Sequence, residues 1–288
     1  MAKICASALF IAATLSPAWA ALPVVVAVLE HPQCGENQSR VIRPIFERNS
    51  GKWKVVNYAT SSTRAPTSWR AVVYGASASS IRSRSPAQMP EPAWTYRRDY
   101  YHSIVPGQEV PSLPNSKQQF GGWCEPPANR PVLLVAHADA KSPELLPPSE
   151  SVGAPPVPML LAAFRKSFGR TKLCVEYNDS KPVVLSPTDI KVVENLRFRD
   201  TSLIAVTLTR ELTECQSELG GADLPRWFVV RGSEIMHVGN SLNFVGAADV
   251  DGDGNVEYVF WYSGYNRDGY VMFNDRFDSA VRFVWNYH

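Results

Sequence analysis

The feature that most constrains the fold is an acidic stretch near the carboxyl end, residues 249–257, which reads DVDGDGNVE. Its aspartates alternate at positions 249, 251 and 253, so a curled loop can direct all three carboxylates to one centre. Runs of β-forming residues precede it from Leu242 and follow it at 258–262. The stretch therefore predicts a cation-binding loop between two strands, with a solvated acidic turn as the alternative.

Calcium is the cation that this spacing predicts, because it takes about six to eight oxygen ligands at about 2.3–2.6 Å. Gly254 follows the third aspartate, where the chain must turn sharply. The predicted ligands are four carboxylates and one backbone carbonyl, from Asp249, Asp251, Asp253, Asn255 (carbonyl) and Glu257. Without a cation these carboxylates would repel one another, and some would be driven toward protonation.

The loop differs from an EF-hand, because Phe260 occupies position twelve, where that loop places a glutamate. A strand-like run follows it instead of a helix. The acid at position nine, Glu257, and the strand after it resemble the calcium loop of FG-GAP repeats, which form β-propeller blades in integrin α chains and many bacterial secreted proteins. Residues 244–248 resemble the lead-in of that repeat. The resemblance spans residues 242–272, occurs once, and implies a calcium loop within a propeller blade.

The first twenty residues predict a secretory signal. Lys3 supplies a positive charge, residues 4–15 form an apolar core, and Ala18-Trp19-Ala20 matches a small-x-small cleavage site. The apolar run is too short to span a bilayer comfortably, although an uncleaved anchor is the alternative. We therefore expect a secreted or periplasmic protein that begins at Ala21, with no membrane span after cleavage.

Four cysteines remain after the signal is removed, because Cys5 lies within it. An even number of cysteines in an exported chain predicts two disulfides, for which three connectivities are possible. We favour Cys34–Cys124 and Cys174–Cys215, since this pairing keeps each bridge within one half of the chain. Free thiols are the alternative.

Short β-forming runs separated by turn residues, together with 23 prolines, predict an all-β fold. We expect a propeller-like array of small antiparallel sheets with one short helix, because residues 157–168 alone show clear helical spacing. Residues 76–92 predict a loop, and Asn266–Gly269 a hairpin turn. The predicted strands lie at 24–29, 41–46, 53–56, 68–74, 132–138, 173–177, 203–208, 227–230, 242–248, 258–262, 270–273 and 281–285.

A proline-rich stretch at 141–158 divides the chain. The predicted organisation is a signal peptide (1–20), an N-terminal β region (21–140), an insertion or linker (141–158) and a C-terminal β region with the calcium loop (159–288). Trp261, Tyr262, Tyr265 and Tyr270 flank the loop, and we expect them to form a sheet core rather than an exposed surface that stacks on sugars.

The charge excludes some partners. The formal net charge is +2 and no basic cluster is present, which argues against nucleic acid and anionic membranes. Nucleophile, metalloprotease, phosphate-loop and dinucleotide motifs are missing from the sequence, and no catalytic residue is identified. The sequence therefore predicts an exported calcium-binding protein that binds a glycan or a protein partner without catalysis. A secreted polysaccharide hydrolase or lyase with a structural calcium is the alternative, and an envelope protein with a role in assembly is a third possibility.

Overall fold

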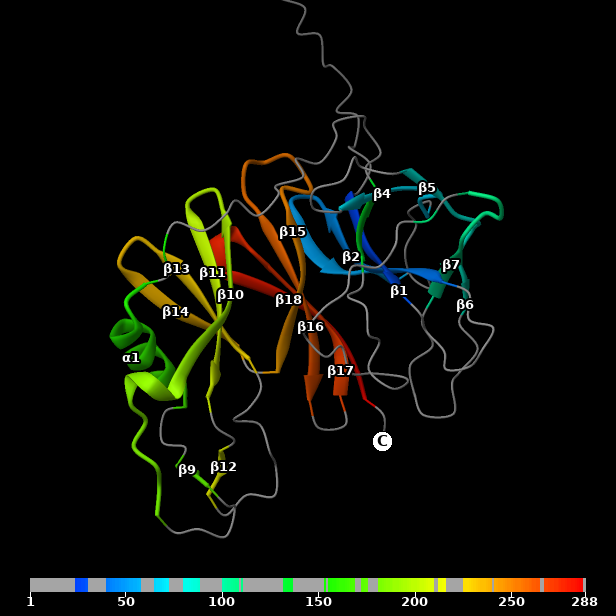
Figure 1. Ribbon diagram of the computed structural model, residues 1–288. Coiled ribbons are helices and arrows are strands. Elements are labelled where there is room, and N and C mark those ends of the chain that lie inside the picture. Colours follow the sequence, from blue (N-terminus) through cyan, green and yellow to red (C-terminus); the bar gives the residue numbers. More distant parts are fainter. Residues whose placement is uncertain are drawn as a thin grey trace, which may run out of the picture.

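The computed structural model describes residues 24–30, 40–57, 65–72, 80–88, 100–108, 110, 132–136, 153, 155–168, 172–175, 181–209, 212–215, 225–239, 241–264 and 267–286. Within these ranges the chain forms antiparallel sheets and a single α-helix (Figure 1). The predicted all-β class with one short helix is confirmed. The sheets stand beside one another as an array, and the described strands do not show a closed propeller.

The N-terminal sheet is built around β1 (Val24–Glu30), which lies between β2 (Val41–Asn49) and β8 (Val132–Ala136). Residues 24–29 and 132–136 are all buried, which explains why both strands are continuous apolar runs. The remaining strands of this sheet are β3 (Lys52–Val55), β4 (Ser68–Val72), β5 (Ser80–Arg82), β6 (Ala87–Gln88) and β7 (Tyr100–Ser103).

Two four-stranded sheets follow in the sequence. We call the first the helix-side sheet; its order is β10 (Ile190–Phe198), β11 (Thr201–Leu208), β13 (Arg226–Arg231) and β14 (Glu234–Gly239). We call the second the C-terminal sheet; its order is β15 (Leu242–Ala248), β16 (Glu257–Gly264), β17 (Arg267–Asn274) and β18 (Ser279–Asn286). In the C-terminal sheet each strand pairs with the next along the chain.

The C-terminal sheet lies between the other two and buries both of its faces. Val259 and Trp261 point into a core cluster shared with the N-terminal sheet, whereas Tyr258 and Phe260 point into one shared with the helix-side sheet. Because neighbouring side chains on a strand point to opposite faces, burying both faces requires an unbroken apolar run, as β16 has. The indole Nε1 of Trp227 in β13 donates to the Leu242 carbonyl at 2.9 Å, which joins two of the sheets.

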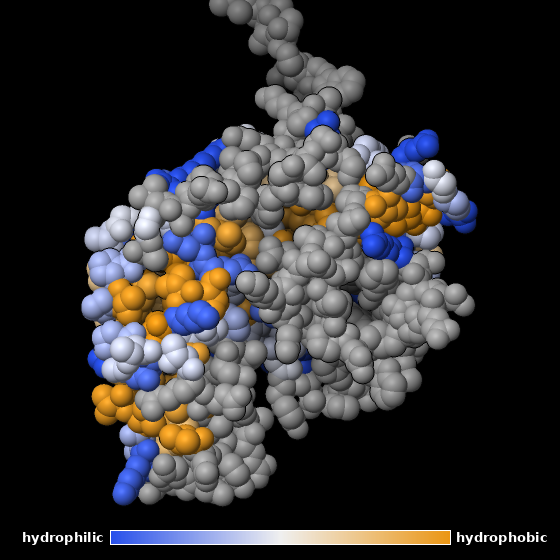
Figure 2. All heavy atoms as spheres, viewed as in Figure 1, coloured by the Kyte–Doolittle hydropathy of each residue, from blue (hydrophilic) through white to orange (hydrophobic). Residues whose placement is uncertain are grey.

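Helix α1 (Val157–Phe168) covers the outer face of the helix-side sheet (Figure 1). Leu160, Leu161 and Phe164 lie at helical spacing and pack against that sheet, as the sequence predicts. The last residues of the predicted linker 141–158 therefore belong to the helix. No helix in the described ranges is long and apolar enough to cross a membrane. Exposed apolar side chains gather near α1 and β10 (Figure 2), and include Val157, Met159, Val184 and Val193.

Two predictions about turns and loops are wrong. Residues 267–269 do not form the predicted hairpin turn, because β17 already begins at Arg267 and Gly269 pairs with Tyr262; Asn266 lies outside the described residues. Gly269 meets a packing need instead: a Cβ there would lie 2.1 Å from the Phe283 carbonyl oxygen. Residues 76–92 are not all loop, because β5 and β6 lie within them; Ile81 of β5 is fully buried against the neighbouring strand.

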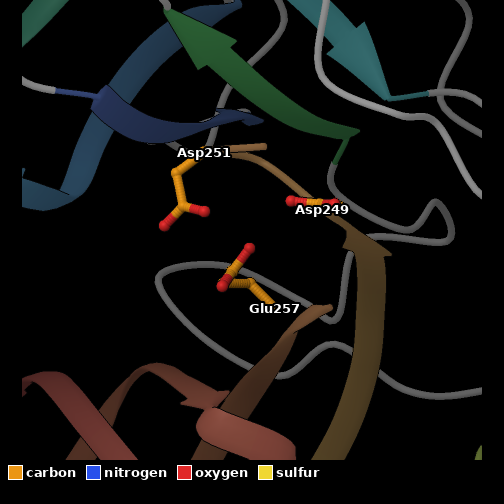
Figure 3. Close-up of side chains that lie close together, drawn as sticks. All are labelled: Asp249, Asp251 and Glu257. Atoms are coloured by element: carbon orange, nitrogen blue, oxygen red, sulfur yellow. The ribbon is translucent and has the colours of Figure 1, made fainter. Parts of the chain in front are cut away.

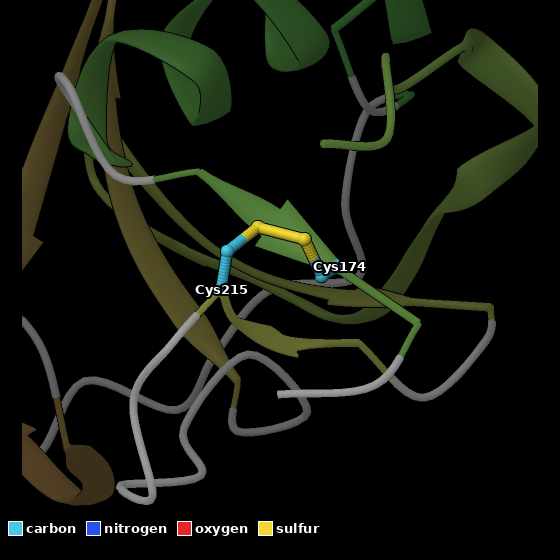
Figure 4. Close-up of a disulfide and its surroundings, with 2 residues drawn as sticks. All are labelled: Cys174 and Cys215. Carbon is cyan, nitrogen blue, oxygen red and sulfur yellow. A yellow bond between two sulfur atoms is a disulfide. The ribbon is translucent and has the colours of Figure 1, made fainter. Parts of the chain in front are cut away.

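The disulfide Cys174–Cys215 is present and confirms one predicted pair (Figure 4). Cys174 ends β9 (Leu173–Cys174), and Cys215 directly follows β12 (Thr213–Glu214), with which β9 pairs. The S–S distance is 2.04 Å and the Cα atoms lie 5.0 Å apart, within the usual range for a disulfide. Cys34 and Cys124 fall outside the described residues, as does the predicted signal peptide.

Candidate metal centre

The acidic loop connects β15 to β16, as the sequence predicts. Its ends are fixed by the sheet, because Ala248 and Glu257 are paired in the β15–β16 ladder. Gly252 and Gly254 have φ angles of 73° and 91°, a left-handed backbone that a residue with a Cβ rarely adopts. These two glycines explain how the chain can reverse tightly and still return Glu257 to the sheet.

Three of the predicted ligands come together in this loop (Figure 3). One carboxylate oxygen from each of Asp249, Asp251 and Glu257 lies within 4.8 Å of the others, close enough to hold one metal ion. Asp249 and Glu257 are 3% and 2% exposed. Asp253 lies outside this group and is exposed, and Asn255 is half-buried. The triad is therefore smaller than the ligand set that the spacing predicts.

Backbone N–H groups of the loop hold the carboxylates in place. Asp249 accepts from Gly252 at 2.9 Å and from Gly254 at 3.0 Å, and Glu257 accepts from Val250 at 3.0 Å. Hydrogen bonds to the charged form of a carboxylate favour that form and fix its orientation. The backbone of the loop therefore fixes the carboxylates of Asp249 and Glu257.

Glu257 carries the largest electrostatic cost in the loop. The pKa of its carboxyl is raised to about 8, chiefly by burial and also by the negative charges of Asp253 and Asp249. The Val250 N–H and the Arg48 guanidinium act in the opposite direction. At neutral pH this carboxyl therefore favours a proton, or a cation in its place.

Two arginines from the other sheets contact the loop, and sequence reasoning missed both. Arg48 of β2 pairs with Asp251, and also with Asp253 at 3.0 Å. Arg199, in the turn between β10 and β11, donates to the Gly254 carbonyl and lies 3.3 Å from Asp249. They lie 203 and 50 residues from the aspartates they pair with, so no local pattern indicates them. Consequently all three sheets meet at this loop.

The loop's charge suits a divalent cation. When all four carboxylates of the loop are ionised, the two guanidinium groups leave two negative charges uncompensated among these side chains; when Glu257 holds a proton, one is left. The candidate ligands are all oxygens, which favours a hard cation over metals that prefer nitrogen or sulfur.

The aromatic residues around the loop mostly form core. Trp261 and Tyr270 are buried and pack edge to face, with ring centroids 5.0 Å apart. This confirms the core assignment for both residues. Tyr262 is half-buried, and Tyr265 lies outside the described residues.

A buried serine–histidine pair occurs in the N-terminal sheet. Ser83 Oγ lies 3.2 Å from His102 Nδ1 and accepts from the Trp69 indole at 2.9 Å. His102 Nδ1 also lies 3.0 Å from the Arg84 carbonyl, which can only accept, so that nitrogen carries the proton and cannot serve as a base for Ser83. Both residues are buried, and burial lowers the pKa of His102. This arrangement is a packing network rather than an activated nucleophile.

Comparison with family models, with curated proteins and with solved structures finds no significant match for this chain. The resemblance to FG-GAP repeats therefore stays a prediction from residues 242–272.

Proposed function

We propose that this chain is an exported calcium-binding β protein whose role is to bind a glycan or a protein partner. The observation that carries the proposal is the triad of Asp249, Asp251 and Glu257, with ligand atoms within 4.8 Å of one another. Its charge and all-oxygen chemistry support calcium in particular. The disulfide Cys174–Cys215 is compatible with an extracellular or periplasmic location, where such bonds persist.

The proposed role of the cation is structural. The loop is contacted by Arg48 from the N-terminal sheet and by Arg199 from the helix-side sheet, while the C-terminal sheet supplies both of its ends. A cation that fixes the three carboxylates would also fix the side chains that these arginines reach. Calcium would thereby stabilise the contact among the sheets rather than take part in a reaction.

Millimolar calcium is expected to raise the melting temperature of the wild-type chain, and Asp251→Asn to remove most of that rise. For about 1 mM free calcium and a dissociation constant of about 10⁻⁴ M, mass action stabilises the folded chain by about 1.4 kcal/mol. For a chain of this size the shift is about 2–3 °C. Calorimetric melts in chelator and in calcium, with a direct calcium titration, measure it.

Two variants make this test specific. Glu257→Gln should be at least as stable as wild type in chelator, because it removes a buried carboxyl whose pKa is about 8, yet it should gain less from calcium. Asp278→Asn, an exposed position outside the loop, should respond to calcium as wild type does. Identical wild-type melts in both buffers, with no calcium uptake, would show that the loop is an acidic turn without a metal.

A further inference from the structure

Arg48 of β2 contacts the same carboxylates that could hold a cation. Its Nη1 donates to Asp251 Oδ2, and also to Asp253 Oδ2 at 3.0 Å. Asp251 is one of the three residues whose carboxylates converge in the loop (Figure 3), and its side chain is 3% exposed. The positive charge of Arg48 also opposes the rise in the pKa of Glu257, a second carboxyl of that triad. The guanidinium therefore supplies part of the positive charge that a metal ion would supply.

The contact between Arg48 and the loop leaves part of the guanidinium unused. A single nitrogen, Nη1, donates to both aspartates, whereas Nε is buried and has no hydrogen-bond partner among the described residues. The strongest arginine–carboxylate pairs use two parallel N–H groups on one carboxylate, and this contact does not. The Arg48 side chain is 24% exposed, so it can move toward solvent without opening the core. The structure therefore holds this cation in a way that allows it to be exchanged.

A divalent cation and the Arg48 guanidinium would compete for Asp251. Two cations on one largely buried carboxylate repel each other strongly, because little water separates them. Asp253 offers Arg48 an alternative partner: it lies outside the triad, and its side chain is 31% exposed. Arg48 can thus leave Asp251 and keep Asp253. The N-terminal sheet would then stay in contact with the loop while a metal takes the triad.

We propose that Arg48 is a built-in competitor of calcium, which pairs with Asp251 when calcium is absent and yields that carboxylate to the metal while it stays with Asp253. This inference rests on the proposed calcium site and adds how the site is regulated. With Arg48 in place, the empty loop avoids part of the repulsion among its carboxylates. The same contact lowers the affinity of the loop for calcium, which suits the weak binding, at about 10⁻⁴–10⁻³ M, of extracellular calcium modules.

The direct test is calorimetric titration of the full chain with calcium, comparing wild type with Arg48→Met. Methionine keeps a long side chain on β2, but it carries no charge and offers the metal no oxygen. Removing the competing charged hydrogen bonds should tighten calcium binding by about tenfold or more. Lys52→Met is the matched control, because it removes the same charge from an exposed position on β3, on the opposite face of the sheet from Arg48. It should bind calcium as wild type does.

Thermal melts separate competition from a purely structural role of Arg48. In chelator Arg48→Met should melt below wild type, because Asp251 has lost its counter-ion. In saturating calcium the difference should shrink, since the metal then holds Asp251 in both proteins. An equal loss of melting temperature in both buffers would overturn the proposal.

Arg48→Lys keeps the test decisive if Arg48→Met does not fold. Its ammonium is a strongly hydrated point charge without the guanidinium fork, so it should compete less well and bind calcium more tightly than wild type. If wild type binds calcium and the Arg48 variants bind it equally or more weakly, competition is overturned while the calcium site stands. If neither wild type nor the variants bind calcium, the proposed function fails as well.

Discussion

Replacing Cys174 and Cys215 with alanine is expected to lower the free energy of unfolding by about 4 kcal/mol. The disulfide closes a loop with a sequence separation of 41 residues, and the chain-entropy model gives about this value for such a loop. The strands that it joins, β9 and β12, have two residues each, so the ladder between them is short. Denaturant unfolding of wild type and variant under oxidising conditions measures the difference.

The single variants provide the control. Either Cys174→Ala or Cys215→Ala breaks the same bond, so each alone should lose most of the stability that the double variant loses. Non-additivity of this kind is the signature of two residues that act as one unit. Equal denaturation midpoints for wild type and the double variant would contradict the prediction.

Asp268 is expected to make the protein less stable as the pH rises from about 4 to about 6. Its carboxyl is 2% exposed, and burial raises its pKa to about 6, against a smaller opposite effect of the hydrogen bond with Ser263. Among the described residues its Oδ1 has no hydrogen-bond partner. The pKa of Asp268 is higher in the folded state than in the unfolded state, so protonation stabilises the folded protein. This stabilisation is complete below the unfolded pKa and is lost as the pH rises past about 6. The free energy of unfolding that is lost in this way amounts to about 3 kcal/mol.

Asp268→Asn should remove this dependence, because the amide stays neutral throughout. The variant should match wild type near pH 4 and exceed its stability above pH 6. Urea unfolding at several pH values gives the difference between the two proteins, which isolates Asp268 from other groups that titrate in this range. Asp278→Asn, at an exposed position, is the control. Parallel pH profiles for wild type and Asp268→Asn would refute the prediction.

Features set by local sequence were predictable. The apolar run of β1, the helical spacing of α1 and the acidic loop each follow from residues close together in the chain. Features that depend on residues far apart in the chain could not be predicted. β1 pairs with β8 more than 100 residues later, and Gly269 fits the close approach of β18. The helix-side sheet also includes β10 and β14, which carry many half-buried and charged positions that hide the strand pattern.

In the candidate site, too, the local features could be predicted and the contacts from distant residues could not. Alternating aspartates and Gly254 predict a loop whose carboxylates converge, and those of Asp249, Asp251 and Glu257 do so. Asp253 departs from the prediction: it is exposed, and it pairs with Arg48, a residue of another sheet. The arginines that contact the loop, Arg48 and Arg199, were missed, since only the packing of the sheets brings them to it.

The middle position of the C-terminal sheet has a consequence for how the chain is made. Synthesis proceeds from the amino end, at about 5–20 residues per second, and this sheet is the last of the three to be produced. Until residues 242–286 are available, the apolar faces that the N-terminal and helix-side sheets bury against it have no cover. Partly synthesised chains therefore expose two apolar surfaces, one on each of the earlier sheets. The two core clusters between the sheets can form only after the strands of the C-terminal sheet have been made.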